Sequence, residues 1–363
     1  MNRISISLPN ALYSVLIGKA VFRELEREIA VFNFPDNIFL IIDKNVYSFL
    51  KDRIEKFINL SYPNAKELLL TSDEKLKSYS SLQKIHGLLL KHRFNRNSLI
   101  IAIGGGIIGD LGGFASAVYM RGIDYINIPT TLLAAVDSSI GGKTGINFGE
   151  TKNSIGAFHH PKLVLVDTDF LGTLPKEEII CGLGEVIKYA FLGEPDFYKY
   201  IYTNLNKALV LNQKVIEKII IDSVKLKAGV VVQDEKEGGL RKILNFGHTF
   251  AHAFEVQQNH KIKHGQAVIA GITCALHLSH IKGLLPAEKL NDFLKIIYKM
   301  KKYVKLNRIN YEKLYAIMRR DKKNRDGRIK FVLIKDIGEI IIDVDAEKKE
   351  IYSAIEKGTA LFS

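Results

Sequence analysis

Side chains that could hold a metal ion gather in the second half of the chain. His248 and His252 are four residues apart, a spacing that places two imidazoles on one face of a helix. His264 follows, and Glu185 with Lys188 forms an i, i+3 pair upstream. One carboxylate and two imidazoles make a catalytic zinc set that leaves a coordination position open for substrate. Spacing alone does not choose the second histidine, so His248 with His252 and His248 with His264 both remain open.

A glycine-rich turn in the first half could bind a phosphate-containing cofactor. Gly104, Gly106 and Gly109 form a G-x-G-x-x-G pattern that follows a strand-like run and opens a helix-like one. Glycines there let backbone N–H groups approach a pyrophosphate at a helix N-terminus, although a tight turn without ligand has the same pattern. In the usual dinucleotide fold, the acid that binds the ribose comes after the next strand. Asp124 precedes that strand, so Asp43, which ends an earlier strand, is the better candidate.

A second glycine-rich segment, residues 129–147, is dense in polar side chains. Gly141-Gly142-Lys143-Thr144 is similar to the end of a Walker A loop, but Asp137 stands where that motif needs its first glycine. Lys143 offers a point charge to a phosphate or a carboxylate. Lys152-Asn153 adds a second cation and an amide close behind. We interpret residues 129–147 as a loop that binds an anion and a cofactor.

Strand-like and helix-like segments alternate in the first half and would position these groups. Continuous apolar runs that fit buried parallel strands cover residues 37–43, 98–103, 125–128 and 163–167. Residues 80–91 and 109–120 are helix-like. This α/β alternation predicts a doubly wound, mostly parallel sheet, which binds ligands beyond the carboxyl ends of its strands.

The pattern becomes mainly helical after Thr173-Leu174-Pro175, where the proline suits the first turn of a helix. Helices are expected over residues 178–192, 211–231, 249–257, 265–282 and 287–300, and a short hairpin over residues 330–342. The sequence therefore predicts two domains: an α/β domain over residues 1–174 and a mainly helical domain over residues 175–363.

Composition narrows the functional classes. The chain has 363 residues, 47% of them hydrophobic, so it can bury a core in each domain and is not disordered. Two cysteines are too few for a disulfide framework, and neither a signal peptide nor an apolar run of roughly 20 residues is present, so we expect a cytoplasmic protein that does not enter a membrane. The net charge of +13 is spread along the chain without arginine-rich blocks, which favours a lysine-rich surface over a nucleic-acid binder. A small anionic substrate would also suit a basic cleft.

Seven separated motifs together resemble the 3-dehydroquinate synthase family of the sugar-phosphate cyclases, over roughly residues 37–335. These motifs are residues 105–110, 130–147, 152–156, 184–189, 244–252, 264–268 and 321–323. Chance agreement at so many separated sites is negligible. One departure is Asp73, which precedes Glu74 where the family usually has glycine.

The resemblance implies an NAD-binding N-terminal domain, a helical metal-binding C-terminal domain, and a substrate held between them. It implies that Glu185, His248 and His264 bind Zn²⁺ or Co²⁺. Positions that match NAD contacts are Asp43, Asn45, Glu74, Lys77, Gly105, Gly106, Ile107, Ile108, Gly109, Asp110, Thr130, Thr131, Lys143, Lys152, Phe170 and Thr173. Positions that match the substrate site are Asp137, Lys143, Asn153, Lys188, Lys227, Arg241, Asn245, His252 and a lysine of Lys322-Lys323. Arg121 matches an arginine that reaches the partner subunit's site, so a homodimer is implied.

The implied reaction converts 3-deoxy-D-arabino-heptulosonate 7-phosphate into 3-dehydroquinate and phosphate, a step of the shikimate pathway. Two alternatives are another sugar-phosphate cyclase, such as a 2-deoxy-scyllo-inosose synthase, and a metal-dependent glycerol-phosphate or alcohol dehydrogenase. Lys227 and Arg241 disfavour the first, because substrates such as glucose 6-phosphate lack a carboxylate. The motifs at residues 141–144 and 321–323 disfavour the second.

Overall fold

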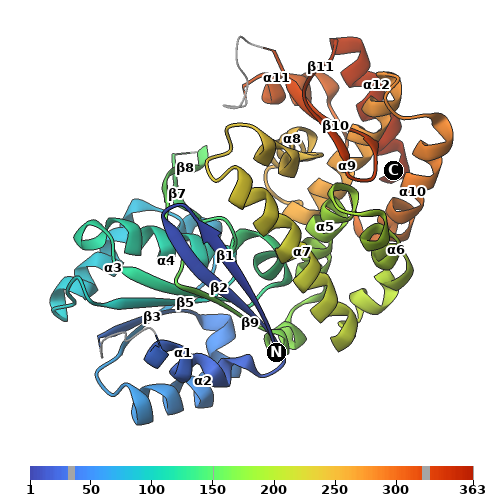
Figure 1. The fold of residues 1–363 in the computed structure, drawn as a ribbon. Helices are drawn as coiled ribbons and strands as arrows, with labels where there is room; N and C mark the ends of the chain where they lie inside the picture. The colour runs from blue at the N-terminus through green and yellow to red at the C-terminus, as the bar shows by residue number, and fades with distance from the viewer. Residues whose placement is uncertain (32–36, 150, 321–327, 363) are drawn as a thin grey trace. The chain divides into compact units, whose positions relative to one another are not determined.

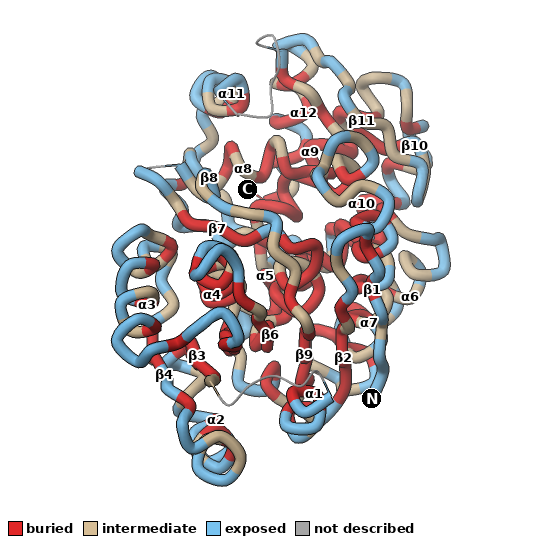
Figure 2. The backbone as a smooth tube through the Cα atoms, turned by 60° about the vertical axis from the view of Figure 1, so that its left-hand side comes forward, coloured by how far each residue is buried: buried red, intermediate tan, exposed pale blue. Residues whose placement is uncertain are grey.

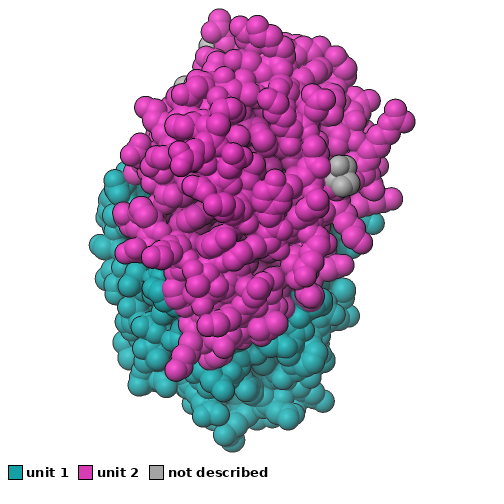
Figure 3. Space-filling model, turned by 90° about the vertical axis from the view of Figure 1, so that its right-hand side faces the viewer, with its two compact units in different colours: residues 1–175, 216–235 teal, residues 176–215, 236–363 magenta. Residues whose placement is uncertain are grey.

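The chain divides into two compact units in the computed structural model, which describes residues 1–31, 37–149, 151–320 and 328–362 (Figures 1 and 3). The first unit comprises residues 1–175 and 216–235, and the second comprises residues 176–215 and 236–363. Helix α7 (Gln213–Gln233) therefore lies mostly in the first unit. Since the units interleave along the chain, a domain boundary near residue 174 stays a prediction.

A seven-stranded sheet forms the centre of the first unit, in the order β1-β2-β9-β6-β5-β3-β4. The strands are β1 (Asn2–Leu8), β2 (Ala11–Gly18), β3 (Ile38–Asp43), β4 (Lys66–Leu70), β5 (Leu99–Gly104), β6 (Asp124–Pro129) and β9 (Leu163–Asp167). Only β1 pairs antiparallel, with β2; the other neighbours in this sheet are parallel. The predicted doubly wound, mostly parallel sheet is confirmed.

Helices cover both faces of this sheet. Successive residues of β3 point to opposite sides: Leu40 and Ile42 join one apolar cluster, Phe39 and Ile41 the other. The helices and helical turns of this unit are η1 (Val21–Glu24), α1 (Leu25–Val31), α2 (Lys44–Lys56), η2 (Phe57–Ser61), η3 (Glu74–Leu76), α3 (Tyr79–Lys91), α4 (Gly106–Val118), η4 (Tyr119–Arg121), η5 (Ala134–Ser138) and η6 (Thr168–Thr173). Figure 2 shows the central strands and much of α4 coloured as buried.

The segment that we interpreted as a binding loop is only partly a loop. Residues from Lys143 onward form strand β7 (Lys143–Phe148), which pairs antiparallel with β8 (Thr151–Phe158). Gly145 and Gly156 lie opposite each other in this hairpin, and a Cβ on Gly156 would lie 2.1 Å from the carbonyl oxygen of Thr144. The glycines therefore allow two strand backbones to approach closely, an arrangement that the interpretation as a binding loop did not include.

Helix α9 (His264–Ile281) is the centre of the second unit, and α5, α8, α10 and α12 pack on it. The other elements are α5 (Lys176–Leu192), α6 (Pro195–Leu209), η7 (Leu240–Asn245), α8 (His248–Gln257), α10 (Ala287–Met300), η8 (Lys301–Tyr303), α11 (Tyr311–Arg319), α12 (Lys348–Thr359), η9 (Ala360–Phe362) and the antiparallel pair β10 (Lys330–Asp336) with β11 (Glu339–Asp345). The mainly helical character and the late hairpin are confirmed. Within the described part of the chain, no helix is both long and apolar enough to cross a bilayer.

Candidate functional site

The carboxyl ends of β3 and β5 mark the point where the strand order of the first unit reverses. The chain leaves β3 for β4 on one side and returns to β5 on the other side of β3. Open α/β sheets bind ligands outside this switch point. Asp43 is the last residue of β3 and Gly104 the last of β5, so the predicted acid and the predicted glycine turn end neighbouring strands.

The turn after β5 is narrow enough to require glycine. A Cβ on Gly105 would lie 3.1 Å from Thr131 Cγ2, and a Cβ on Gly106 would lie 3.0 Å from Ser138 Oγ. Gly105 is the N-cap of α4 and no side chain caps this helix start. Thr130 is 2% exposed, and its hydroxyl oxygen makes no hydrogen bond within the described residues. A tight turn, an open helix N-terminus and a buried hydroxyl fit a bound pyrophosphate.

Lys77 contacts two other residues of the predicted site. Its ammonium lies 2.6 Å from Asp110 Oδ2 and also donates to Asn153 Oδ1, and the residue is only 4% exposed. Burial raises the pKa of the Asp110 carboxyl, and the charge of Lys77 opposes that rise. Glu74 Oε1 accepts a hydrogen bond of 2.8 Å from Asn147 Nδ2. One predicted NAD contact, Asp110, and one predicted substrate contact, Asn153, are thus bonded to Lys77, whereas Glu74 is bonded to Asn147.

Lys227 and Asp137 form a second ion pair in the first unit. The Lys227 ammonium pairs with the Asp137 carboxylate and lies 2.7 Å from its carbonyl oxygen. The two residues are 90 positions apart, and they meet because α7 contributes to this unit. The fold therefore brings together two members of the predicted substrate site.

Glu185, His248 and His264 meet in the second unit. His248 Nε2 and His264 Nε2 lie 3.3 and 3.0 Å from Glu185 Oε1, and the potential ligand atoms of the three residues all lie within 4.8 Å of one another. His252 lies beside them, with its ring centroid 5.4 Å from that of His248, but it is not part of the group. The geometry favours His248 with His264, the pair that spacing alone left open.

The outer nitrogens of both imidazoles have acceptors. His248 Nδ1 lies 3.2 Å from the carbonyl oxygen of Phe246, and His264 Nδ1 lies 3.4 Å from Glu255 Oε1. A carbonyl or carboxylate at Nδ1 keeps the proton there and leaves Nε2 as the metal ligand. Glu255, which the sequence reading missed, follows His252 by three residues on α8, so the same-face spacing was the signal that could have found it.

Charge balance supports an ionised carboxylate at this buried position. Burial alone would raise the pKa of Glu185, but Lys188, whose Nζ lies 2.5 Å from Oε2, and the two imidazoles hold it well below its ordinary value. Burial lowers the pKa of His248 to about 4. Burial also opposes protonation of His264, yet hydrogen bonds to Glu185 and Glu255 raise its pKa well above the usual value.

Other predicted residues lie in varied surroundings. Arg241 is 2% exposed within η7, and Asn245 donates to Glu237 Oε1 at 2.7 Å. Phe170 is buried in the apolar core with its ring 5.8 Å from that of Phe22. Arg121 ends η4 with a φ of 70°.

The remaining predicted residues are distributed as follows. Asp43 Oδ1 accepts from the Asn45 N–H at 2.9 Å, and Ser72 donates to its other oxygen. Thr173 Oγ1 donates to the carbonyl of Phe170 at 3.0 Å. Lys152 lies on β8, and Ile107, Ile108 and Gly109 lie in the first turn of α4. Lys322 and Lys323 lie outside the described residues.

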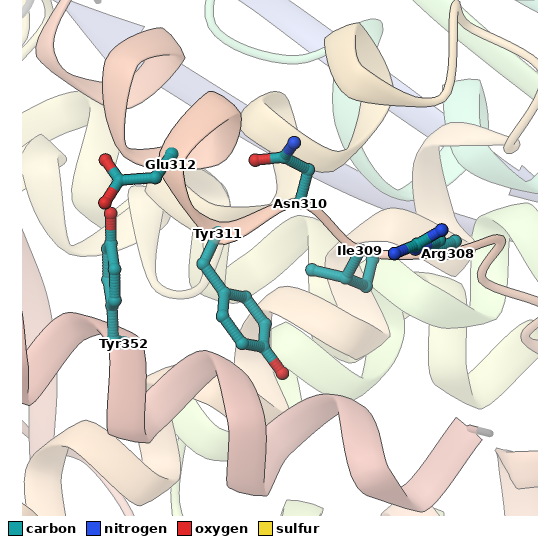
Figure 4. A pocket seen from close by; sticks show the side chains of 6 residues that line it. All are labelled: Arg308, Ile309, Asn310, Tyr311, Glu312 and Tyr352. Carbon is teal, nitrogen blue, oxygen red and sulfur yellow. The ribbon is translucent and has the colours of Figure 1, made fainter.

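A separate cavity of about 530 Å³ opens in the second unit, and none of its lining residues belongs to the predicted site (Figure 4). Arg308, Ile309, Asn310, Tyr311, Glu312 and Tyr352 line it.

Solved structures place the fold in a class shared by sugar-phosphate cyclases and metal-containing alcohol dehydrogenases. A 2-deoxy-scyllo-inosose synthase complexed with carbaglucose-6-phosphate, NAD⁺ and Co²⁺ superposes with a TM-score of 0.88 at 23% identity, covering 98% of this chain and 100% of that one. A 2-epi-5-epi-valiolone synthase from Streptomyces hygroscopicus with NAD⁺ and Zn²⁺ bound gives 0.84 at 23% identity, covering 98% of each chain. An iron-containing alcohol dehydrogenase from Thermotoga maritima gives 0.67 at 15% identity, covering 98% and 99%.

Sequence similarity selects one family within that class. The family model of the 3-dehydroquinate synthase N-terminal part matches residues 67–181, and that of the C-terminal part matches residues 182–324. The 3-dehydroquinate synthase of Alkaliphilus metalliredigens is 39% identical over 341 residues, 94% of each chain, and that of Pelagibacter ubique is 38% identical over 98% of each. The chain belongs to the 3-dehydroquinate synthase family.

Proposed function

We propose that this protein converts 3-deoxy-D-arabino-heptulosonate 7-phosphate into 3-dehydroquinate and phosphate. The observation that carries this proposal is the 39% identity to a 3-dehydroquinate synthase over 94% of both chains. The alternatives are similar in fold only, at 12–15% identity for the dehydrogenases.

Glu185, His248 and His264 would hold Zn²⁺ or Co²⁺. The donor set fits either ion, because it joins one ionised carboxylate to two imidazoles that have acceptors on their outer nitrogens. For NAD, the turn at Gly105 and Gly106 with the uncapped start of α4 fits the pyrophosphate, and Asp43 at the neighbouring strand end fits the ribose. When bound, NAD would take up a hydride and return it, and the metal would polarise substrate oxygens.

The need for transient oxidation follows from the substrate. Phosphate elimination requires loss of a proton from the adjacent carbon, and that proton is too weakly acidic beside an alcohol. Oxidation of the C5 alcohol to a ketone acidifies it. Because the hydride is returned after elimination, the substrate undergoes no net oxidation, and ring opening with aldol closure completes the product.

The chain's own residues bind and orient the substrate in this proposal. Lys188, His252 and Asn245 orient hydroxyl groups and move protons. Lys143, Asn153 and a lysine of Lys322-Lys323 hold the phosphate, and Lys227 with Arg241 secures an anionic group of the substrate. The buried cation of Lys188 beside Glu185 and the pairing of Lys227 with Asp137 support these roles, since both lysines are held in place by carboxylates.

We also propose a homodimer in which Arg121 reaches the partner subunit's site, acting in the cytoplasm. The exposed position of Arg121 at the end of η4 and the two buried free thiols, Cys181 and Cys274, support these two statements.

Release of inorganic phosphate from the heptulosonate phosphate tests the proposed function. We expect turnover with NAD and Zn²⁺ or Co²⁺, loss of turnover with a chelator, and recovery when either metal is restored. NADH should not accumulate. Stoichiometric NADH would indicate a dehydrogenase, and phosphate release from glucose 6-phosphate instead would indicate another cyclase.

A further inference from the structure

Asn147 of β7 makes four hydrogen bonds to residues of the predicted site. Its Nδ2 donates to Glu74 Oε1 at 2.8 Å and to the Glu74 carbonyl at 3.3 Å. Its Oδ1 accepts from the Asn153 N–H at 2.8 Å, and its own N–H donates to the Lys77 carbonyl at 2.8 Å. One side chain therefore connects η3, which carries Glu74, to β8, which carries Asn153.

The chemistry of this position requires a primary amide. The Glu74 carboxylate needs a donor, and the Asn153 N–H needs an acceptor, so the side chain between them must supply both. A carboxylate at position 147 would accept from Asn153 but would face Glu74 with like charge. An apolar side chain would satisfy neither group. Asparagine fits both partners within one short side chain.

The Asn153 backbone depends on this contact. Asn153 has a φ of 50°, in the left-handed region that non-glycine residues adopt infrequently. Its N–H is held by Asn147, and its side-chain oxygen accepts from Lys77. Lys77 in turn pairs with Asp110. Asn153 is thus held by a network that contains Asn147 and two predicted NAD contacts, Lys77 and Asp110.

We propose that Asn147 is a positioning residue that holds a cofactor contact, Glu74, and a substrate contact, Asn153, in one geometry. This inference rests on the proposed function, because the roles of Glu74 and Asn153 come from it. Asn147 itself touches neither ligand in this account. Its loss should weaken the binding of both ligands together.

The test compares Asn147→Asp and Asn147→Ala with the wild-type protein. Isothermal titration calorimetry gives the Kd for NAD, and phosphate release gives KM and kcat for the heptulosonate phosphate. In Asn147→Ala we expect both the Kd for NAD and the KM to rise by about tenfold, because Glu74 loses its donor and the Asn153 N–H loses its acceptor. Asn147→Asp still accepts from Asn153, so its Kd for NAD should rise by about tenfold and its KM should rise less. Asn97→Asp, an exposed asparagine in the same unit, should leave both constants unchanged.

Measuring NAD affinity at acid pH distinguishes the loss of this positioning contact from a general loss of structure. Protonation of the new carboxyl in Asn147→Asp restores a donor toward Glu74, so this variant should regain NAD affinity as the pH falls, whereas Asn147→Ala should not. If Asn147→Ala keeps either the Kd for NAD or the KM within about twofold of wild type, the inference is overturned while the proposed function stands. If the wild type releases no phosphate, the proposed function fails, and the NAD titrations still decide whether Asn147 acts on Glu74.

Discussion

Gly184 of α5 and Gly265 of α9 touch backbone to backbone. A Cβ on Gly184 would lie 2.3 Å from the Gly265 carbonyl oxygen, and a Cβ on Gly265 would lie 1.9 Å from the carbonyl oxygen of Cys181. Each glycine is the chain neighbour of a predicted metal ligand, Glu185 or His264. The close helix approach is therefore what brings these two ligands to 3.0 Å from each other.

Gly265→Ala should disturb both stability and metal binding. The added methyl has no space, so α5 and α9 must move apart, which costs about 3 kcal/mol by comparison with overpacked cores. Thermal unfolding should show a lower Tm, and metal content after dialysis should fall. Gly87→Ala is the matched control, since nothing lies within 4 Å of its Cβ. That helical substitution should be neutral or stabilise by about 0.4–1 kcal/mol. An unchanged Tm in Gly265→Ala would contradict the packing argument.

Separate histidine variants should identify the ligands. His248→Ala and His264→Ala each remove an imidazole whose Nε2 lies within 3.3 Å of Glu185 Oε1. Both should lose bound Zn²⁺ after dialysis while remaining folded by circular dichroism. His252→Ala should retain one Zn²⁺ per chain but lose activity, because we assign it to the substrate. Zinc retained in His264→Ala and lost in His252→Ala would restore the pair that sequence spacing left open.

Glu255→Gln should weaken metal binding without removing a ligand. The carboxylate that accepts from His264 Nδ1 fixes the ring and increases its basicity, and loss of such a contact typically costs 10–100-fold in metal affinity. Competition with a chromogenic chelator measures this affinity directly. Glu288→Gln, an exposed change on α10, is the control. Equal affinities in the two variants would rule out a role for Glu255.

Local sequence patterns predicted the elements whose signal lies within one segment. The buried strands β3, β5, β6 and β9 are continuous apolar runs, and the helices that carry Glu185, His248 and His264 coincide closely with the expected helices over residues 178–192, 249–257 and 265–282. The β7–β8 hairpin was not predicted, because glycines in a closely paired strand and glycines in a flexible loop give the same local sequence pattern. The pairing of Gly145 with Gly156 is visible only in the structure.

Contacts between distant segments could not be predicted in this way. His252 is four residues from His248, and His264 is 16 residues away, yet the fold places His264 against Glu185. The Lys227–Asp137 pair depends on α7 returning to the first unit. Resemblance to a family supplied what periodicity could not, namely which of several polar residues act together. Glu255 lies outside the seven motifs, and Asn147 ends one of them without an assigned role, so only the structure revealed their contacts.

His277 should make the protein less stable in mild acid. Burial, with the nearby charges of Lys357 and His280, lowers its pKa from 6.5 to about 4. The unfolded chain therefore takes up a proton below pH 6.5 that the folded chain resists, so stability falls as the pH drops from 6.5 toward 4. His277→Gln removes this proton uptake. Between pH 7 and pH 5, its Tm should fall at least about 2 °C less than that of the wild type.

The comparison must hold the metal concentration fixed, because His248 and His264 also titrate and remain in both proteins. Differential scanning calorimetry at a series of pH values gives the slope of Tm against pH for the wild type and for His277→Gln. The difference between these two slopes is the contribution of His277. Parallel slopes for His277→Gln and wild type would show that His277 is as easily protonated in the folded protein as in the unfolded chain.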